Sequence, residues 1–175
     1  NAPKKIILMT GRVEDPMKGF ARLREAGAFL AKTRDDFEIW ATHTDTRLNN
    51  RWFRAVGWHD HREIRKLYAQ SDICVTPSIW AEPFGMVAVE AMASGRPVVA
   101  SRVGGLQGIV TTDETGYLYD AENAFALASY LAALLDDETL RMQMGARARE
   151  RAESHYDWAR VIETHYPPIL EAIAR

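Results

Sequence analysis

Short apolar runs alternate with helical segments along this chain, and that alternation limits the folds open to it. Apolar runs of the kind that form buried strands cover residues 5–9, 37–40, 52–56, 73–76, 97–101 and 116–119. Helical patterns lie between them, and the chain from Leu127 onward is helical. Such βαβ units predict an α/β fold: a Rossmann-like, mainly parallel sheet with helices on both faces.

Local signals give the expected helix bounds. Helices are expected at about 17–33, from Asp60 onward and at about 85–93, and the polar stretch 42–50 is expected to be a loop or a short helix. Asp60 precedes a helical run with Glu63 in capping-box position, and Asp137 and Asp157 are expected to cap later helices. Ser94-Gly95 followed by a proline predicts a helix end, and Pro167-Pro168 is expected to interrupt the last helix.

The length of 175 residues fits one domain, which we place at 3–175. Asn1-Ala2 resembles a cloning scar, and the abrupt start in a strand suggests a fragment of a longer protein. The single cysteine, Cys74, lies in an apolar run and is expected to be a buried thiol in a reducing, cytoplasmic compartment. No apolar stretch is long enough for a membrane span, and no signal peptide opens the chain.

The charge balance and the missing motifs limit the classes of ligand that this chain is expected to bind. Lys+Arg is 22 and Asp+Glu is 24, which gives a formal net charge of −2 and excludes a global basic field for binding nucleic acid. The five histidines show no metal-ligand spacing, so we expect no metal and no cofactor. The sequence has neither GxGxxG nor GxxxxGK[ST], which argues against a dinucleotide oxidoreductase and a P-loop NTPase.

Polar residues follow several of the predicted strands, where ligands of parallel sheets bind. Arg12 and Lys18 flank a Gly-bounded loop after the first strand, so the two cations can bind an anion together with a helix N-terminus. The alternative is a pair of solvated surface charges. Trp58 and Trp80 are expected in loops beside this site, where they either line a pocket or cover the sheet edge.

Two glutamates form the most informative pattern. Glu90 sits among apolar residues in a helix expected to be buried nearly all round, so its carboxylate needs partners. Glu82 lies just before that helix and can bind hydroxyl groups there. The alternative is a capping Glu82 and a core Glu90 paired with a structural arginine. Gly104-Gly105 forms either an anion-binding nest or a tight turn.

Four motifs in this order resemble a known family. They are Gly11-Arg12 with Lys18-Gly19, then Ser71-Asp-Ile-Cys-Val-Thr-Pro-Ser78, then Glu82-Pro-Phe-Gly with Glu90-Ala-Met-Ala-Ser-Gly95, and Pro97-Val-Val-Ala-Ser-Arg-Val-Gly-Gly105. Over roughly residues 5–165 the chain is similar to the C-terminal, donor-binding half of retaining GT-B glycosyltransferases of family 4, also called group 1. The glutamates eight positions apart are the specific signal.

The resemblance implies a role for each matching residue. Arg12 and Lys18 would grip the diphosphate of a UDP- or GDP-sugar, Glu82 would contact hydroxyls of the sugar, and Glu90 would hold the ribose. It implies catalytic roles for Arg12, Lys18 and Glu82, without a metal. Backbone groups of Phe84, Gly85, Met86 and Val87 would approach the sugar and phosphates, with Gly57 and Trp58 near the base. Gly108 departs from the family, in which an acidic residue is common at that position.

The same resemblance sets the expected activity. It implies a glycosyltransferase, active as the full-length protein, in lipopolysaccharide or other surface-polysaccharide synthesis. Its acceptor site would lie in an N-terminal domain absent from this sequence, so the chain alone should bind nucleotide and not transfer sugar. The resemblance leaves open whether the full-length protein associates peripherally with the inner face of the membrane. The alternatives are a sugar-nucleotide-binding module and a GT-B-like epimerase or phosphorylase.

Overall fold

Six parallel strands form the centre of the molecule. The structure, a computed structural model, describes the backbone of residues 3–173 and the side chains in that range except at positions 165, 171 and 172. The strands are β1 (Lys5–Met9), β2 (Phe37–Ala41), β3 (Phe53–Ala55), β4 (Ile73–Thr76), β5 (Val98–Ser101) and β6 (Gly116–Tyr119). They lie side by side in the order β3-β2-β1-β4-β5-β6, and every pair is parallel. The predicted fold class is confirmed.

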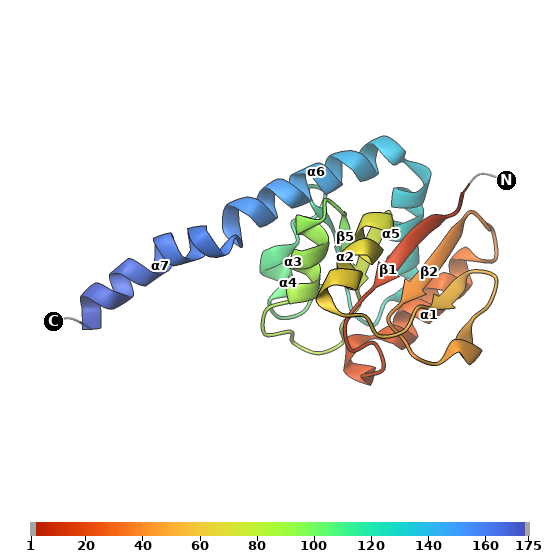
Figure 1. Ribbon diagram of the computed structural model, residues 1–175. Helices are drawn as coiled ribbons and strands as arrows, with labels where there is room; N and C mark the ends of the chain where they lie inside the picture. Colours follow the sequence, from red (N-terminus) through yellow and green to blue (C-terminus); the bar gives the residue numbers. More distant parts are fainter. Residues whose placement is uncertain (1–2, 174–175) are drawn as a thin grey trace.

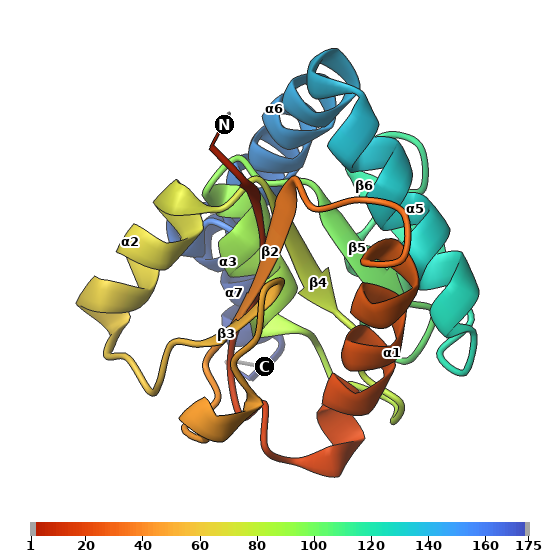
Figure 2. The same ribbon diagram turned by 90° about the vertical axis from the view of Figure 1, so that its right-hand side faces the viewer.

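Helices cover both faces of this sheet (Figure 2). They are α1 (Phe20–Leu30), α2 (His61–Gln70), α3 (Met86–Ala93), α4 (Leu106–Ile109), α5 (Ala124–Asp136), α6 (Glu138–His155) and α7 (Trp158–Ile173), with short 3₁₀ helices η1 (Pro16–Lys18) and η2 (Thr46–Leu48). Helices α1 and α5 pack together on one face, and α2, α3 and α6 cover the other. The loops at the carboxyl ends of β1 and β4 therefore lie at one edge of the sheet, between the helices of one face and those of the other.

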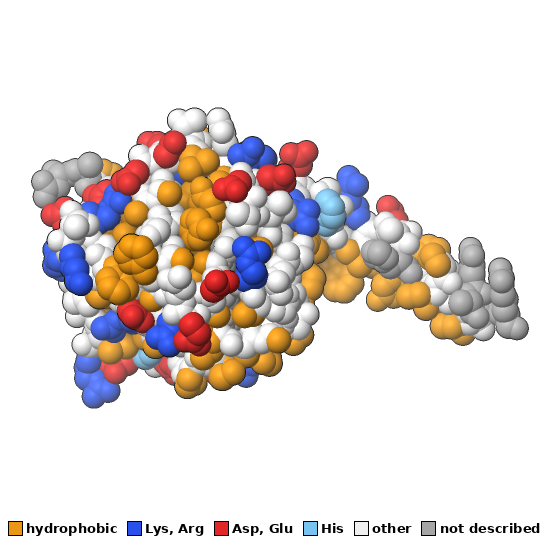
Figure 3. All heavy atoms as spheres, turned by 180° about the vertical axis from the view of Figure 1, so that it is seen from behind, with side chains coloured by type: hydrophobic (Ala, Val, Ile, Leu, Met, Phe, Trp, Pro, Cys, Tyr) orange, Lys and Arg blue, Asp and Glu red, His pale blue; other side chains and the backbone are white. Residues whose placement is uncertain are grey.

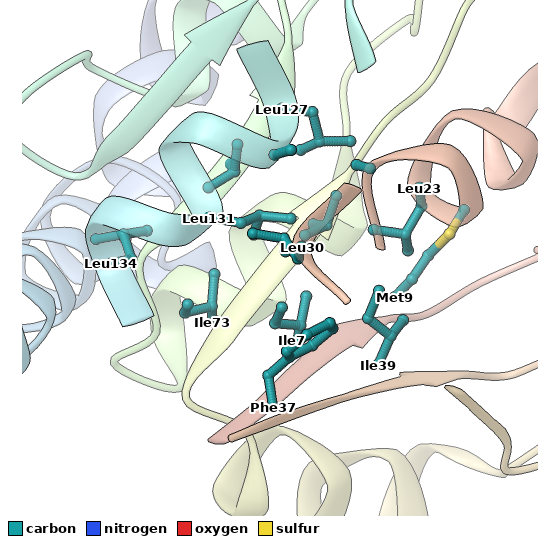
Figure 4. Packing of buried hydrophobic residues seen from close by; sticks show 14 of the residues in the cluster. Ile7, Met9, Leu23, Leu30, Phe37, Ile39, Ile73, Leu127, Leu131 and Leu134 are labelled. Carbon is teal, nitrogen blue, oxygen red and sulfur yellow. The ribbon is translucent and has the colours of Figure 1, made fainter. Parts of the chain in front are cut away.

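Each face of the sheet has its own apolar core. Figure 4 shows the larger one, where Leu23 and Leu30 of α1 and Leu127 and Leu131 of α5 meet the strand residue Ile7. The second core includes Leu8, Cys74 and Met92 between the sheet and α2, α3 and α6. Cys74 is buried as predicted. A central strand buried on both faces explains the near-continuous apolar runs of the sequence.

The first predicted helix differs from the structure at its start. Residues 16–18 form η1, and α1 begins at Phe20 instead of near 17. Gly19 separates the two with a φ of +75°, and a Cβ there would lie 1.7 Å from the carbonyl oxygen of Pro77. This left-handed residue breaks the helix and holds the end of η1 against the loop that follows β4.

Most of the remaining local predictions are confirmed. Asp60 and Asp137 accept hydrogen bonds from the first free amides of α2 and α6, and Asp157 does so at the start of α7. The short helix η2 lies within 42–50. The predicted interruption at Pro167-Pro168 is wrong, because α7 runs through both prolines. Helix α4, directly after the Gly104-Gly105 turn, was not predicted.

Helices α6 and α7 continue beyond the body of the domain (Figure 1), and α7 projects from it. Apolar side chains gather along this projection (Figure 3), among them Trp158, Ile162, Ile169 and Leu170, which are all exposed. Within residues 3–173, no helix combines the length and the low charge that crossing a bilayer requires.

Candidate functional site

A cavity opens where the strand order reverses. The chain moves outward from β1 through β2 to β3, returns to β4 beside β1, and then continues to β5 and β6. At this switch point the carboxyl ends of β1 and β4 border a cavity of about 410 Å³, the position where open α/β sheets bind ligands. Its lining is Met9, Thr10, Gly11, Arg12, Lys18, Trp58, Val75, Thr76, Pro77, Ser78, Glu82, Pro83, Phe84, Gly85, Met86 and Val87. Eight of the ten predicted site residues line this cavity, and the two that do not are Gly57 and Glu90.

Lys18 reaches into this cavity from the end of η1. That helix starts with Asp15, whose carboxylate accepts a hydrogen bond from the amide of Met17. The Nζ atom of Lys18 donates to Oε1 of Glu82 over 2.7 Å and lies 5.2 Å from the ring centre of Trp80. Two partners therefore hold the ammonium group of Lys18 at the wall of the cavity.

Glu82 is a buried carboxylate with two side-chain donors. Oε1 accepts a hydrogen bond from Ser78 Oγ at 2.5 Å as well as the one from Lys18. Burial raises the pKa of the Glu82 carboxyl, but the hydrogen bonds from Lys18 and Ser78 and the charge of Lys18 outweigh it, so the net shift is downward. Glu82 is therefore ionised at neutral pH. It does not cap α3, since Gly85 occupies the N-cap position.

The Gly104-Gly105 turn contacts the backbone of the loop that carries Glu82. The amide of Gly105 donates to the carbonyl oxygen of Glu82 over 2.7 Å. A Cβ on Gly105 would lie 2.4 Å from the carbonyl oxygen of Phe84, so the two loops touch along their backbones. Of the two alternatives, the structure shows a tight turn whose Gly105 amide is already used by the protein.

The N-terminus of α3 points toward the cavity, because Gly85, Met86 and Val87 all line it. No side chain caps this end, so amides of the first turn are free to meet a ligand, and the helix dipole favours an anion there. The expectation that α3 is buried nearly all round is wrong. Met86 is 59% exposed and Val87 is half-buried, because this apolar turn faces the cavity instead of the core.

Glu90 lies about one turn after Met86 in α3 and borders a second cavity of about 320 Å³. It is half-buried, and its Oε2 accepts a hydrogen bond from the Tyr68 hydroxyl at 3.1 Å. Among the described side chains no arginine pairs with Glu90, so the alternative of a structural ion pair finds no support. Thr10, Gly11, Trp58 and Val87 line both cavities and connect them.

Arg12 and Trp58 are exposed residues of the cavity lining, whereas Gly57 lies outside it. Arg12 is exposed and makes no ion pair with any described residue, so its guanidinium is free for a ligand. Trp58 is 70% exposed and borders both cavities. Gly57 lines neither, and its carbonyl oxygen lies 3.0 Å from Nδ1 of His59. Trp80 contacts Lys18 and is absent from both linings.

Three polar residues of the site were not singled out from the sequence. Thr10 directly follows β1 and Ser78 comes two positions after the end of β4, so the rule about carboxyl ends would have found both. Tyr68 falls on the apolar face of α2, which hid the use of its hydroxyl. Within residues 3–173, no group of three or more His, Cys, Asp or Glu side chains is placed to hold a metal ion.

The family description "Glycosyl transferases group 1" matches residues 1–151. The chain belongs to this family. Across 178 aligned residues it is 32% identical to phosphatidyl-myo-inositol mannosyltransferase of Mycobacterium leprae, covering 97% of this chain and 47% of that protein. The chain spans less than half of the length of the curated relatives it matches.

Solved structures show the same fold. Sucrose-phosphate synthase from Thermosynechococcus elongatus superposes with a TM-score of 0.84 at 29% identity, over 99% of this chain and 47% of that one. Anabaena HepE, solved in complex with UDP and glucose, superposes with a TM-score of 0.82 at 25% identity, over 99% of this chain and 49% of that one. This group 1 glycosyltransferase chain therefore has the Rossmann-like fold of a GT-B domain.

Proposed function

We propose that this chain is the donor-binding part of a retaining, metal-independent glycosyltransferase, with a nucleoside-diphosphate sugar as its ligand. One observation carries the proposal: the cavity at the switch point brings Arg12, Lys18, Glu82 and the free N-terminus of α3 together. A site with two cations and a helix N-terminus fits a diphosphate. The UDP complex of HepE, a protein of the same fold, supports a nucleotide ligand.

The cations and the helix would also assist the reaction. When the glycosidic bond to the diphosphate breaks, negative charge grows on the leaving phosphate oxygen. Arg12, Lys18 and the first amides of α3 would stabilise that charge, and Lys18 and the amides are held in place before the reaction begins. Charge stabilisation of this kind needs no divalent ion, which is why we propose a metal-independent enzyme.

The two glutamates would orient the ligand on either side of the diphosphate. Glu82 shares one oxygen with Lys18 and Ser78, so its Oε2 is the atom best placed to accept a hydroxyl of the donor sugar. Glu90 borders the adjoining cavity with Trp58, which fits a ribose and its base. Charge-assisted hydrogen bonds from hydroxyls to carboxylates are stronger than neutral ones, which favours a single ligand orientation.

We propose that the acceptor is bound outside the residues of this chain, which spans less than half of the length of its relatives. The names of the curated relatives include an inositol phosphate glycosyltransferase, a phosphatidylinositol mannosyltransferase and glycogen synthase, and do not single out lipopolysaccharide. We therefore propose glycan or glycoconjugate synthesis at the cytoplasmic side of the cell. We expect the isolated chain to bind nucleotide without transferring sugar.

Calorimetry tests this proposal. The chain is titrated with UDP, GDP and ADP in a chelating buffer, and again with magnesium. We expect at least one nucleotide to bind equally well in both buffers. Binding that requires magnesium would remove metal independence, and the absence of binding to all three would contradict the proposed function. A sugar-nucleotide-binding module would bind in the same way, but its full-length protein would transfer no sugar to any acceptor.

A further inference from the structure

The hydroxyl of Tyr68 contacts residues that line the two cavities, although Tyr68 itself belongs to the core. Its side chain is 2% exposed and packs in the second apolar core with Leu67, Ala88 and Met92. Burial raises the pKa of the phenol far above its ordinary value of 10.0, so the hydroxyl keeps its proton at every working pH. A hydroxyl that stays protonated therefore lies directly behind residues that line the site.

Three oxygen atoms surround this hydroxyl. Thr10 Oγ1 lies 2.8 Å away, Glu90 Oε2 3.1 Å away and the carbonyl oxygen of Val87 3.4 Å away. A phenol has a single hydrogen to donate, and a charged carboxylate is a stronger acceptor than a more distant carbonyl. The hydrogen of Tyr68 therefore points at Glu90.

That assignment fixes the direction of the third contact. With its hydrogen used, the Tyr68 oxygen can only accept from Thr10, so the Thr10 hydroxyl must be the donor. The result is a directed chain, Thr10 to Tyr68 to Glu90, that joins the end of β1 to α2 and α3. It ends on the carboxylate that borders the cavity of about 320 Å³.

Glu90 has no other described side chain that holds it. Neither of its oxygens takes part in an ion pair within the described residues, and Tyr68 is the donor found for its Oε2. Without that donor a glutamate side chain in a solvated cavity is free to change rotamer, and fixing it on ligand binding costs entropy.

We infer that Tyr68 is a positioning residue: its hydroxyl holds Oε2 of Glu90 so that the other carboxylate oxygen faces the ribose of the nucleotide. The inference rests on the proposed function, since it assigns Tyr68 to the same ligand site. Tyr68 does not touch the nucleotide and acts through Glu90.

The test compares Tyr68→Phe, which keeps the ring in the core, with Tyr119→Phe as a matched control. Tyr119 is also 2% exposed, its hydroxyl has no hydrogen-bond partner among the described residues, and it lines neither cavity. Each variant is titrated with whichever of UDP, GDP and ADP binds the unmodified chain, and thermal unfolding confirms that it is folded. We expect Tyr68→Phe to weaken binding roughly tenfold, about the effect of one hydrogen bond to a charged group. Tyr119→Phe should bind like the unmodified chain.

Measuring Tyr68→Phe in a chain that is also substituted at Glu90 distinguishes positioning of Glu90 from a general effect on the fold. In Glu90→Ala the side chain that Tyr68 holds is gone, so adding Tyr68→Phe should change the affinity less than about twofold. A tenfold loss in that background, or unchanged affinity in Tyr68→Phe alone, overturns the inference and leaves the proposed function standing. If the unmodified chain binds none of the three nucleotides, both are contradicted.

Discussion

Lys18 and Glu82 are 64 positions apart in the chain, and Nζ of one lies 2.7 Å from Oε1 of the other. Gly19 makes this contact possible, because it lets the end of η1 lie directly against Pro77. The pair places a cation and a carboxylate side by side in one cavity. We expect both groups to serve the ligand, Lys18 at the phosphates and Glu82 at the sugar.

Loss of Lys18 should affect stability as well as binding. Lys18→Ala leaves the buried Glu82 carboxylate without its cationic partner, and we expect the unfolding free energy to fall by about 1–3 kcal/mol. Urea denaturation measures the change. The double variant Lys18→Ala/Glu82→Gln should recover part of it, because the uncompensated charge is removed. A double variant less stable than the sum of the single changes would contradict this account.

The Glu82 carboxyl should make stability depend on pH. Its pKa in the folded chain lies below the ordinary value of 4.5. The ionised group therefore stabilises the fold above pH 4.5, and the contribution is lost as the pH falls from there through the folded pKa. Comparing the unmodified chain with Glu82→Gln, we expect the stability difference to be largest near pH 7 and to shrink below pH 4.5. A difference that is constant from pH 7 to pH 3 would refute the assignment.

Gly19 and Gly57 provide a matched comparison. Both have φ near +80°, but a Cβ at Gly57 meets nothing within 4 Å, whereas one at Gly19 meets the Pro77 carbonyl. Gly57→Ala should cost about 1–2 kcal/mol of unfolding free energy, the strain of a left-handed residue. Gly19→Ala should cost more than about 3 kcal/mol, because backbone must move as well. Equal losses in urea denaturation would show that the contact with Pro77 is unimportant.

Tyr119→Phe should stabilise the chain. The Tyr119 hydroxyl is buried and has no hydrogen-bond partner within the described part of the chain, so removing it ends a desolvation penalty of about 1 kcal/mol. A rise in the urea midpoint at an unchanged m-value is the expected result. A clear loss of stability would mean that a partner, such as an ordered water, satisfies this hydroxyl.

The sequence predicted all six strands because β4, β5 and β6 are short apolar runs buried at every position, and β1, β2 and β3 carry buried apolar residues on at least one face. It misplaced the burial of α3, because the side chains of Met86 and Val87 are apolar whether they face a core or a cavity. It also did not predict the Lys18–Glu82 pair or the hydroxyl of Tyr68. Both depend on which loops meet at the switch point, and that follows from the strand order, which local patterns do not contain.

Helix α7 is a second element whose structure the local sequence pattern did not predict. Two adjacent prolines predict a break, since each removes a backbone donor and crowds the preceding turn. The helix nevertheless continues from Trp158 to Ile173. Pro167 and Pro168 are exposed there, so the carbonyl groups that lose their partners can turn to solvent.

The most direct test of the central claim is a calorimetric titration in a chelating buffer of the unmodified chain, Lys18→Ala and Lys66→Ala. Lys66 is an exposed cation on α2 that lines neither cavity. We predict that the unmodified chain and Lys66→Ala bind the same nucleotide with equal affinity, and that Lys18→Ala loses about 1.5–3 kcal/mol, roughly 10- to 150-fold in Kd. Equal affinity in all three would contradict the claim that Lys18 holds the diphosphate in this cavity.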